Sequence, residues 1–215
     1  EKDPAPKLQA PLSPEASMTH MQVPPGFKLS LFAHEPMIIN PIHMDWDHKG
    51  RLWVIETIDY PNEVHEKNGV GDDKIKILED TDGDGKADKM TVFADNLNIP
   101  TGFVFVNGGI LLAQAPHFLF LADSDGDDIA DIRTVINTGW GVSDTHAGAS
   151  NLSYGFDNKF WGTVGYSGFN GSIGSERLRF DQAVYNLTTD YKKLTVHTMT
   201  TNNTCLLYTS PSPRD

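Results

Sequence analysis

The chain has 215 residues, of which 39% are hydrophobic and 10% aromatic, a composition that supports one sizeable core and argues against disorder. Its formal net charge of −12 argues against a nucleic-acid partner, because a phosphate-binding surface needs clustered Lys and Arg. No apolar run approaches the roughly 18–20 residues that span a bilayer, so we expect no membrane span.

The two ends of the chain differ in composition from the middle. Residues 1–22 are rich in proline and charge and poor in large apolar side chains, which predicts a flexible leader. Residues 205–215 resemble the peptide produced when a sequencing adapter is translated in frame, and we expect the natural chain to continue differently after Thr204. The single cysteine, Cys205, lies in this tail, so no disulfide framework is expected.

Order is expected from residue 23 onward, in short strands. Residues 28–33 form the first strand-like run, and three pairs of apolar runs joined by Asp-, Asn- or Gly-containing turns follow at residues 42–56, 102–113 and 152–164. Such pairs are typical of β-hairpins. Trp46, Trp53 and Trp161 occupy strand positions, and we assign them to the core.

Two acidic loops, residues 80–88 and 123–131, repeat one pattern 43 residues apart. Each places carboxylates at positions 1, 3, 5 and 9, the type of spacing that wraps oxygen ligands around a hard cation such as Ca²⁺. The predicted ligands are Asp80, Asp82, Asp84 and Asp88 in the first loop and Asp123, Asp125, Asp127 and Asp131 in the second.

The alternative for these loops is a solvated acidic turn, since Asp and Gly are preferred in turns. Position 6 is Gly85 in the first loop and Asp128 in the second, which makes the second prediction weaker. Thr91 and Thr134 occupy position 12, where an EF-hand has a bidentate Glu. We therefore expect the loops to join neighbouring strands as structural sites, with any catalysis elsewhere.

The repeat extends into strand-like runs on both sides of each loop, and no long window has helical periodicity. This pattern predicts an all-β fold. A repeat unit of about 40–50 residues is the length of one propeller blade, so residues 23–204 are expected to form a partial β-propeller of about four blades from a fold of about six. A β-sandwich is the alternative, against which the repeat weighs.

The candidate catalytic residues lie in the Gly-rich connection of residues 140–148. An imidazole such as His146 can take a proton from an alcohol, and Asp144 can orient the ring. His146 could instead simply hydrogen-bond a neighbouring loop, and Asp144 could cap a turn. Arg51 and Tyr60 could face a central substrate or cofactor pocket, or they could serve in a surface ion pair and in core packing.

Six segments carry a resemblance to a known family. They are residues 24–27 (Pro-Pro-Gly-Phe), 47–54 (Asp-His-Lys-Gly-Arg-Leu-Trp-Val), 77–85 (Ile-Leu-Glu-Asp-Thr-Asp-Gly-Asp-Gly), 100–102 (Pro-Thr-Gly), 144–146 (Asp-Thr-His) and 154–157 (Tyr-Gly-Phe-Asp). Together they resemble the N-terminal domain of the membrane-bound dehydrogenase-like proteins of planctomycetes and verrucomicrobia, across residues 23–204. The propeller of those proteins is similar to soluble quinoprotein glucose and sorbosone dehydrogenases.

This resemblance implies a secreted oxidoreductase, periplasmic or extracellular, that acts on a sugar or alcohol with pyrroloquinoline quinone (PQQ) and is followed by a haem c domain. In the quinoprotein enzymes a His shortly before a Leu-x-x-Gly-x-Asp hairpin is the base, and His146 matches that position before residues 152–157. The usual Pro-Asp-Gly turn is Phe156-Asp157-Asn158 here. The blades that supply most quinone ligands in those enzymes lie beyond Thr204 or are absent. The alternative function is a non-catalytic, Ca²⁺-stabilised propeller that binds a glycan or another protein.

Overall fold

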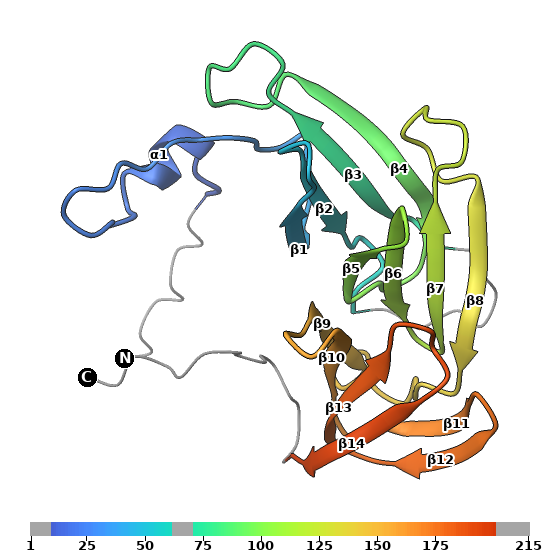
Figure 1. The fold of residues 1–215 in the computed structure, drawn as a ribbon. Helices are drawn as coiled ribbons and strands as arrows, with labels where there is room; N and C mark the ends of the chain where they lie inside the picture. The colour runs from blue at the N-terminus through green and yellow to red at the C-terminus, as the bar shows by residue number, and fades with distance from the viewer. Residues whose placement is uncertain (1–9, 62–70, 201–215) are drawn as a thin grey trace, which may run out of the picture.

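The computed structural model describes residues 10–61 and 71–200. Within these residues the chain forms fourteen β-strands in four antiparallel sheets and one five-residue helix, α1 (Pro14–Met18), as Figure 1 shows. The prediction of an all-β fold is confirmed. Among the described residues, none of the helical structure is long and apolar enough to cross a membrane.

Three of the sheets have four strands each, and Figure 1 shows them following one another in chain order. The first sheet contains β1 (Pro41–Trp46), β2 (Leu52–Glu56), β3 (Asp73–Glu79) and β4 (Lys89–Leu97). The second contains β5 (Gly102–Val106), β6 (Gly109–Gln114), β7 (His117–Ala122) and β8 (Ile132–Thr138). The third contains β9 (Ala149–Tyr154), β10 (Lys159–Val164), β13 (Ala183–Thr188) and β14 (Leu194–Met199), and β11 (Phe169–Ile173) and β12 (Glu176–Phe180) form a separate ribbon.

The three predicted hairpins are present as β1–β2, β5–β6 and β9–β10. Each acidic loop joins the third and fourth strands of its sheet, so the repeat read from the sequence corresponds to the same structural unit twice. The predicted strand at residues 28–33 is wrong, because these residues form no strand. Their backbone instead passes the first acidic loop, where the carbonyl of Phe32 accepts a hydrogen bond from Ala87 N at 2.8 Å.

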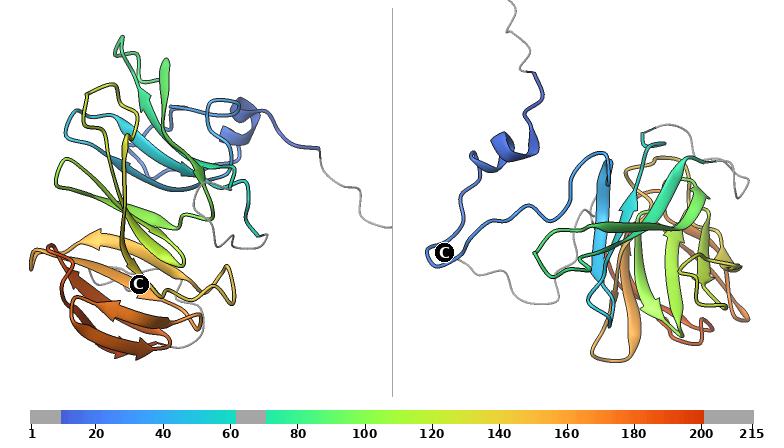
Figure 2. Two further views of the ribbon diagram at one scale, coloured as in Figure 1. Left: turned by 90° about the vertical axis from the view of Figure 1, so that its right-hand side faces the viewer. Right: turned by 90° about the horizontal axis from the view of Figure 1, so that it is seen from above.

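The core lies between successive sheets, which follow one another from top to bottom in the left view of Figure 2. Side chains alternate across a strand, and in β6 this sends Ile110 and Leu112 to a core shared with the first sheet. Leu111 and Ala113 point to a core shared with the third sheet and the ribbon. β6 is a continuous apolar run because both of its faces are buried.

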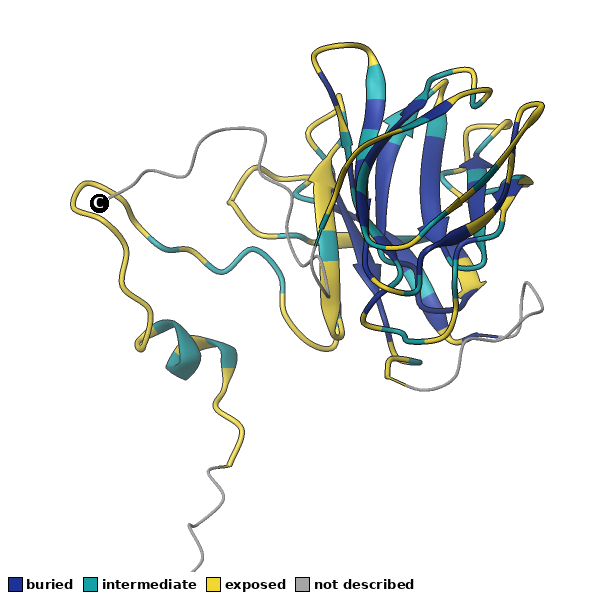
Figure 3. Ribbon diagram, turned by 90° about the horizontal axis from the view of Figure 1, so that it is seen from below, coloured by how far each residue is buried: buried dark blue, intermediate teal, exposed yellow. Residues whose placement is uncertain are grey.

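Trp53 lies in the core, as predicted, but Trp46 does not. Trp46 ends the edge strand β1 on the first sheet's outer face, where the ring of Phe32 packs edge-on against it with centroids 5.5 Å apart, and 51% of its surface remains exposed. The rest of that face is covered by residues 32–38, which pack on Leu52, Val54 and Leu78. Figure 3 shows buried residues concentrated in the strands and exposed ones along the N-terminal segment.

Strand directions divide the sheets into two ends. The turn before β2 and both acidic loops lie at one end, which we call the acidic-loop end, and a 2.8 Å ion pair between Arg51 and Asp128 joins two of these segments. Connections of residues 57–61, 98–101, 139–148 and 165–168 lie at the other end, which we call the connection end. There the Thr101 hydroxyl donates a hydrogen bond to the carbonyl of Ala149 at 2.5 Å.

Candidate functional site

At the connection end, residues 139–148 and 165–168 approach each other closely because Gly141 has no side chain to keep them apart. The amide of Gly141 donates to the carbonyl of Gly168 at 2.9 Å, and a Cβ on Gly141 would lie 1.8 Å from the carbonyl oxygen of Ser167. The Ser167 hydroxyl accepts from Asp144 N at 3.2 Å and donates to the Asp144 carbonyl at 3.0 Å. The backbone of Asp144 is therefore fixed from both sides by one side chain.

The carboxylate of Asp144 is held by three donors. Its Oδ1 accepts from His146 N at 2.7 Å and lies 3.0 Å from His146 Nδ1, while Oδ2 accepts from the hydroxyl of Tyr166. The Tyr166 hydrogen bond, together with those from His146, lowers the pKa of Asp144, and the same contact raises the pKa of Tyr166. An ionised carboxylate only accepts hydrogen bonds, so the geometry assigns the proton of neutral His146 to Nδ1 and the lone pair to Nε2.

Tyr60 reaches the same place from the first sheet. Its ring packs edge-on against His146, with ring centroids 5.2 Å apart and an interplanar angle of 77°. The segment before Tyr60 is anchored by the fully buried Asp73, whose carboxylate accepts from Thr57 Oγ1 at 3.0 Å and from two following backbone amides. A small pocket of about 290 Å³ adjoins Tyr60. The structure thus brings Tyr60, Asp144 and His146 together from segments more than 80 residues apart in sequence.

Tyr60 and His146 remain accessible. The Tyr60 residue is 40% exposed, so the core-packing alternative for it is not what the structure shows, and the His146 side chain is 55% exposed. Both can therefore contact a small molecule from solvent.

Arg51 lies far from this group. It precedes β2 while Tyr60 follows it, and a five-residue strand is about 17 Å long. The guanidinium is ion-paired to Asp47 at 2.8 Å through Nε and to Asp128 at 2.8 Å through Nη1. Asp47 also accepts from the indole of Trp53 at 3.0 Å. Arg51 therefore joins the first and second sheets at the acidic-loop end, and the structure separates it from Tyr60 and from the predicted catalytic residues.

The acidic loops gather three carboxylates each. Oxygens of Asp80, Asp82 and Asp88 lie within 4.8 Å of one another in the first loop, as do those of Asp123, Asp125 and Asp127 in the second. The predicted fourth ligands, Asp84 and Asp131, are not in these groups. Position 1 has the same role in both loops, since Asp80 and Asp123 accept hydrogen bonds from backbone amides of their own loops.

The last carboxylate of each loop closes it. Asp88 accepts from the amide and hydroxyl of Thr81, and Asp131 accepts from the same groups of Ser124. In the second loop the negative charge of Asp127, more than any other neighbour, raises the pKa of Asp125. The carboxylates of this loop therefore repel one another, which a divalent cation would relieve.

Asp128, the residue that departs from the first loop, has a structural reason to be there. Its φ of +66° is close to the +88° of Gly85, so position 6 is left-handed in both loops. Asp tolerates that conformation better than most residues, and its carboxylate supplies the partner of Arg51.

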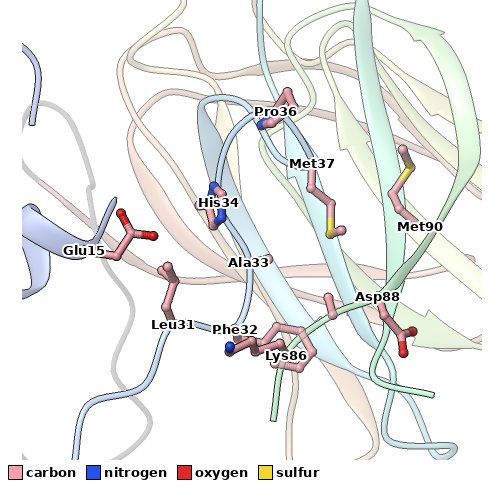
Figure 4. A pocket seen from close by; sticks show the side chains of 11 residues that line it. Glu15, Leu31, Phe32, Ala33, His34, Pro36, Met37, Lys86, Asp88 and Met90 are labelled. Atoms are coloured by element: carbon pink, nitrogen blue, oxygen red, sulfur yellow. The ribbon is translucent and has the colours of Figure 1, made fainter. Parts of the chain in front are cut away.

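A larger pocket of about 650 Å³ lies between residues 31–37 and the first acidic loop, and Figure 4 shows its lining. It is mainly apolar, with Phe32, Met37 and Met90 among its walls and Asp88 at its edge. It lies at the acidic-loop end and contains none of the predicted catalytic residues. Tyr166 and Ser167, which hold Asp144, were not predicted, because nothing in the sequence links them to a residue more than 20 positions earlier.

Fold and site together define an all-β protein of repeated antiparallel sheets, with a histidine–carboxylate pair at one end and twin acidic loops at the other. The model of a family described as "Domain of unknown function (DUF7133)" matches residues 13–212, and the chain belongs to this family. No curated protein matches the chain.

Proposed function

We propose that the chain is the propeller portion of a sugar or alcohol dehydrogenase-like oxidoreductase, in which His146 accepts the proton of the substrate hydroxyl. The observation that carries this proposal is the exposed imidazole whose Nδ1 is engaged by Asp144, so that Nε2 is the proton acceptor. The adjoining ring of Tyr60 offers an apolar contact, and a small pocket lined by Tyr60 and residues 40–42 and 57 lies beside that ring.

The propeller assignment is supported by how the sheets repeat. Each of the three larger sheets has four antiparallel strands, and successive sheets share apolar cores. Radial repetition of such sheets is how a propeller buries both faces of every blade. We propose that each of these four-stranded sheets is one blade and that the complete fold has about six blades.

Oxidation of an alcohol to a carbonyl removes a hydroxyl proton and a hydride from the adjacent carbon. In the resembling enzymes PQQ accepts the hydride. The described residues near His146 do not form an evident quinone site, because Arg51, the cation predicted to contribute, is paired with Asp47 and Asp128 at the opposite end. We therefore derive only the proton step: His146 Nε2 takes the proton while Asp144 stabilises the resulting imidazolium.

The test compares two histidine variants of the full-length protein, reconstituted with PQQ and Ca²⁺ and assayed for dye reduction with a panel of sugars and alcohols. His146→Asn should lower kcat/KM by about 10²–10⁴-fold. His48→Asn, at the exposed turn of the acidic-loop end, is the matched control and should keep activity. Absence of dye reduction by the wild-type protein with every substrate would refute the proposed function.

We further propose that each acidic loop binds Ca²⁺ as a structural ion. The donors are hard carboxylate oxygens gathered within 4.8 Å, which fits a hard cation, and the mutual repulsion around Asp125 is what such an ion would remove. A ligand that binds only the folded state raises its stability. Thermal unfolding with excess Ca²⁺ should therefore give a higher Tm than with chelator, and equal values would remove the calcium proposal.

The resemblance also leads us to propose a periplasmic or extracellular location and a haem c domain downstream in the intact protein, whose chemistry would be electron transfer. The complete gene provides the check: it should encode a secretion signal and a Cys-x-x-Cys-His segment. A gene without either would contradict this part of the proposal.

A second function, a non-catalytic propeller that binds a glycan or protein, is favoured by one observation. Met44 and Trp46 alternate along β1 on the outer face of the first sheet, opposite Val54 and Leu52, and each is about half exposed or more. Exposed apolar rows of this kind occur at interaction sites. On a glycan array or in a pull-down, this function requires that Met44→Ser abolish binding and that His146→Asn leave it intact.

A further inference from the structure

We propose that Tyr166 is a positioning residue for His146: its hydroxyl holds one oxygen of Asp144, so that the other oxygen fixes the imidazole as the Nδ1–H tautomer. The inference rests on the proposed function only for its catalytic consequence. Its structural part concerns the side chains of Asp144, His146 and Tyr166, which lie on the two connections that touch at residues 139–148 and 165–168.

Asp144 has little conformational freedom left. Its backbone is clamped by the hydroxyl of Ser167 through both N–H and C=O, so only the side-chain torsions remain to be fixed. Oδ1 receives two donors from His146, and the Tyr166 hydroxyl is the contact described for Oδ2. Without that hydroxyl, only the donors of His146 would hold the carboxylate, so its rotation would break one hydrogen bond fewer and the acceptor at Nδ1 would be less firmly fixed.

The contact between Asp144 and Nδ1 determines the state of the other nitrogen of the His146 ring, Nε2. Neutral imidazole carries one proton, and the hydrogen bond at one nitrogen decides which nitrogen keeps the lone pair. With Oδ1 held at Nδ1, the acceptor is Nε2. The groups that face His146 are Asp144 on its own connection, Tyr60 from the first sheet and, through Asp144, Tyr166 from the neighbouring connection.

Electrostatics agree with this geometry. The hydrogen bond from Tyr166 is the largest cause that lowers the pKa of Asp144. Tyr166 therefore keeps the carboxylate ionised as well as oriented, and an ionised carboxylate cannot donate to Nδ1. Since Tyr166 is 42% exposed, its removal leaves no cavity in the core, and the hydroxyl can be deleted with little effect on packing.

The experiment is Tyr166→Phe, which removes one oxygen atom, with Tyr154→Phe as the matched control. Tyr154 is also an exposed tyrosine with a hydroxyl bound to a nearby side chain, Asn158 at 3.3 Å, but it lies at the other end of β9. In the wild-type protein and the control, ¹⁵N NMR should show His146 predominantly as the Nδ1–H tautomer. In Tyr166→Phe the population should shift toward Nε2–H, and carboxyl ¹³C titration should show a higher pKa for Asp144.

An unchanged tautomer and an unchanged Asp144 titration in a folded Tyr166→Phe protein would overturn the inference. Should that variant fail to fold, Asp144→Ala removes the acceptor itself and must also abolish the Nδ1–H preference.

Kinetics separate this inference from the proposed function. If the protein is a dehydrogenase, Tyr166→Phe should lower kcat about tenfold with little change in KM, because the loss is in proton transfer. A tautomer shift in a protein without dehydrogenase activity would support the positioning role and reject the function. Dehydrogenase activity with an unchanged tautomer in Tyr166→Phe would support the proposed function and reject the positioning role.

Discussion

Substitution of Asp128 separates two opposing contributions to stability where the first and second sheets meet: the cost of a left-handed backbone and the gain from an ion pair with Arg51. The residue pays for a left-handed backbone, at a φ of +66°, and gains an ion pair with Arg51, whose side chain is 11% exposed. Loss of this pair should cost about 1–2 kcal/mol, between the values for exposed and buried pairs, because Arg51 keeps Asp47 as a partner. A left-handed backbone costs an ordinary L-residue about 1–2 kcal/mol.

Three variants should therefore rank in a fixed order. Asp128→Ala loses the pair and keeps the unfavourable backbone that the wild type already has, for a total of about 1–2 kcal/mol. Asp128→Gly loses the pair but relieves the backbone, for about 0–1 kcal/mol. Asp128→Asn keeps a residue that tolerates the left-handed region and loses only the charge, for about 1 kcal/mol. Gly85→Asp in the first loop, where a Cβ would meet nothing within 4 Å, is the reciprocal control and should cost about 1 kcal/mol.

Urea unfolding followed by circular dichroism, with excess chelator so that metal affinity does not enter, measures all four changes. The m-value should stay constant across the series. Equal stability of the Ala and Gly variants, within about 0.5 kcal/mol, would refute the backbone argument. An Asn variant as stable as the wild type would refute the contribution of the charge pair with Arg51.

Three further perturbations have defined outcomes. Lys76→Met leaves the buried carboxylate of Glu56 without its 2.7 Å partner and should cost about 3–5 kcal/mol in urea unfolding, whereas Lys76→Met with Glu56→Leu should recover most of that loss. Asp73→Ala removes the acceptor of four donors from residues 57–59 and 99 and should cost at least about 3 kcal/mol; a smaller loss of thermal stability would contradict the anchoring role of this carboxylate. The raised pKa of Asp125 means that the folded state binds its proton more tightly, so this contribution to stability is present at acid pH and is lost as pH rises through the raised pKa. In chelator at pH 7, Asp125→Asn should therefore raise Tm, and an unchanged Tm would count against the repulsion.

Local patterns were sufficient to predict most of the fold. The hairpins and the acidic loops depend on turn residues and alternation within a few positions of one another, and all are present in the structure. Residues 28–33 were predicted as a strand because they form a short strand-like run, but a strand also needs a neighbour to pair with, and that depends on the rest of the fold. Trp46 was assigned to the core because it occupies a strand position, which does not reveal whether that strand lies at an edge.

The site was predictable only in part, because its contacts are not local. Asp144 and His146 are two positions apart, so their pairing follows from one short connection. Tyr60 joins them across two sheets, and only the packing of those sheets could place it there. Arg51 does not join the site as predicted, because its ion-pair partners come from a turn beside it and from a loop 77 positions later. Asp128 stands where the first loop has Gly85, and this difference suggested a weaker metal site in the second loop. The structure explains Asp128 as the partner of Arg51.

The arrangement of the two ends separates the roles of the acidic loops and of His146. The strands between them are about 17–20 Å long for five or six residues, and sites more than about 7–10 Å apart without shared partners contribute additively. Calcium removal should therefore lower stability without changing the tautomer of His146, and Tyr166→Phe should change the tautomer without changing the effect of calcium on Tm. If chelation alone altered the imidazole, the loops would have to act on the site through the sheets, and a purely structural role for the bound ions would be wrong.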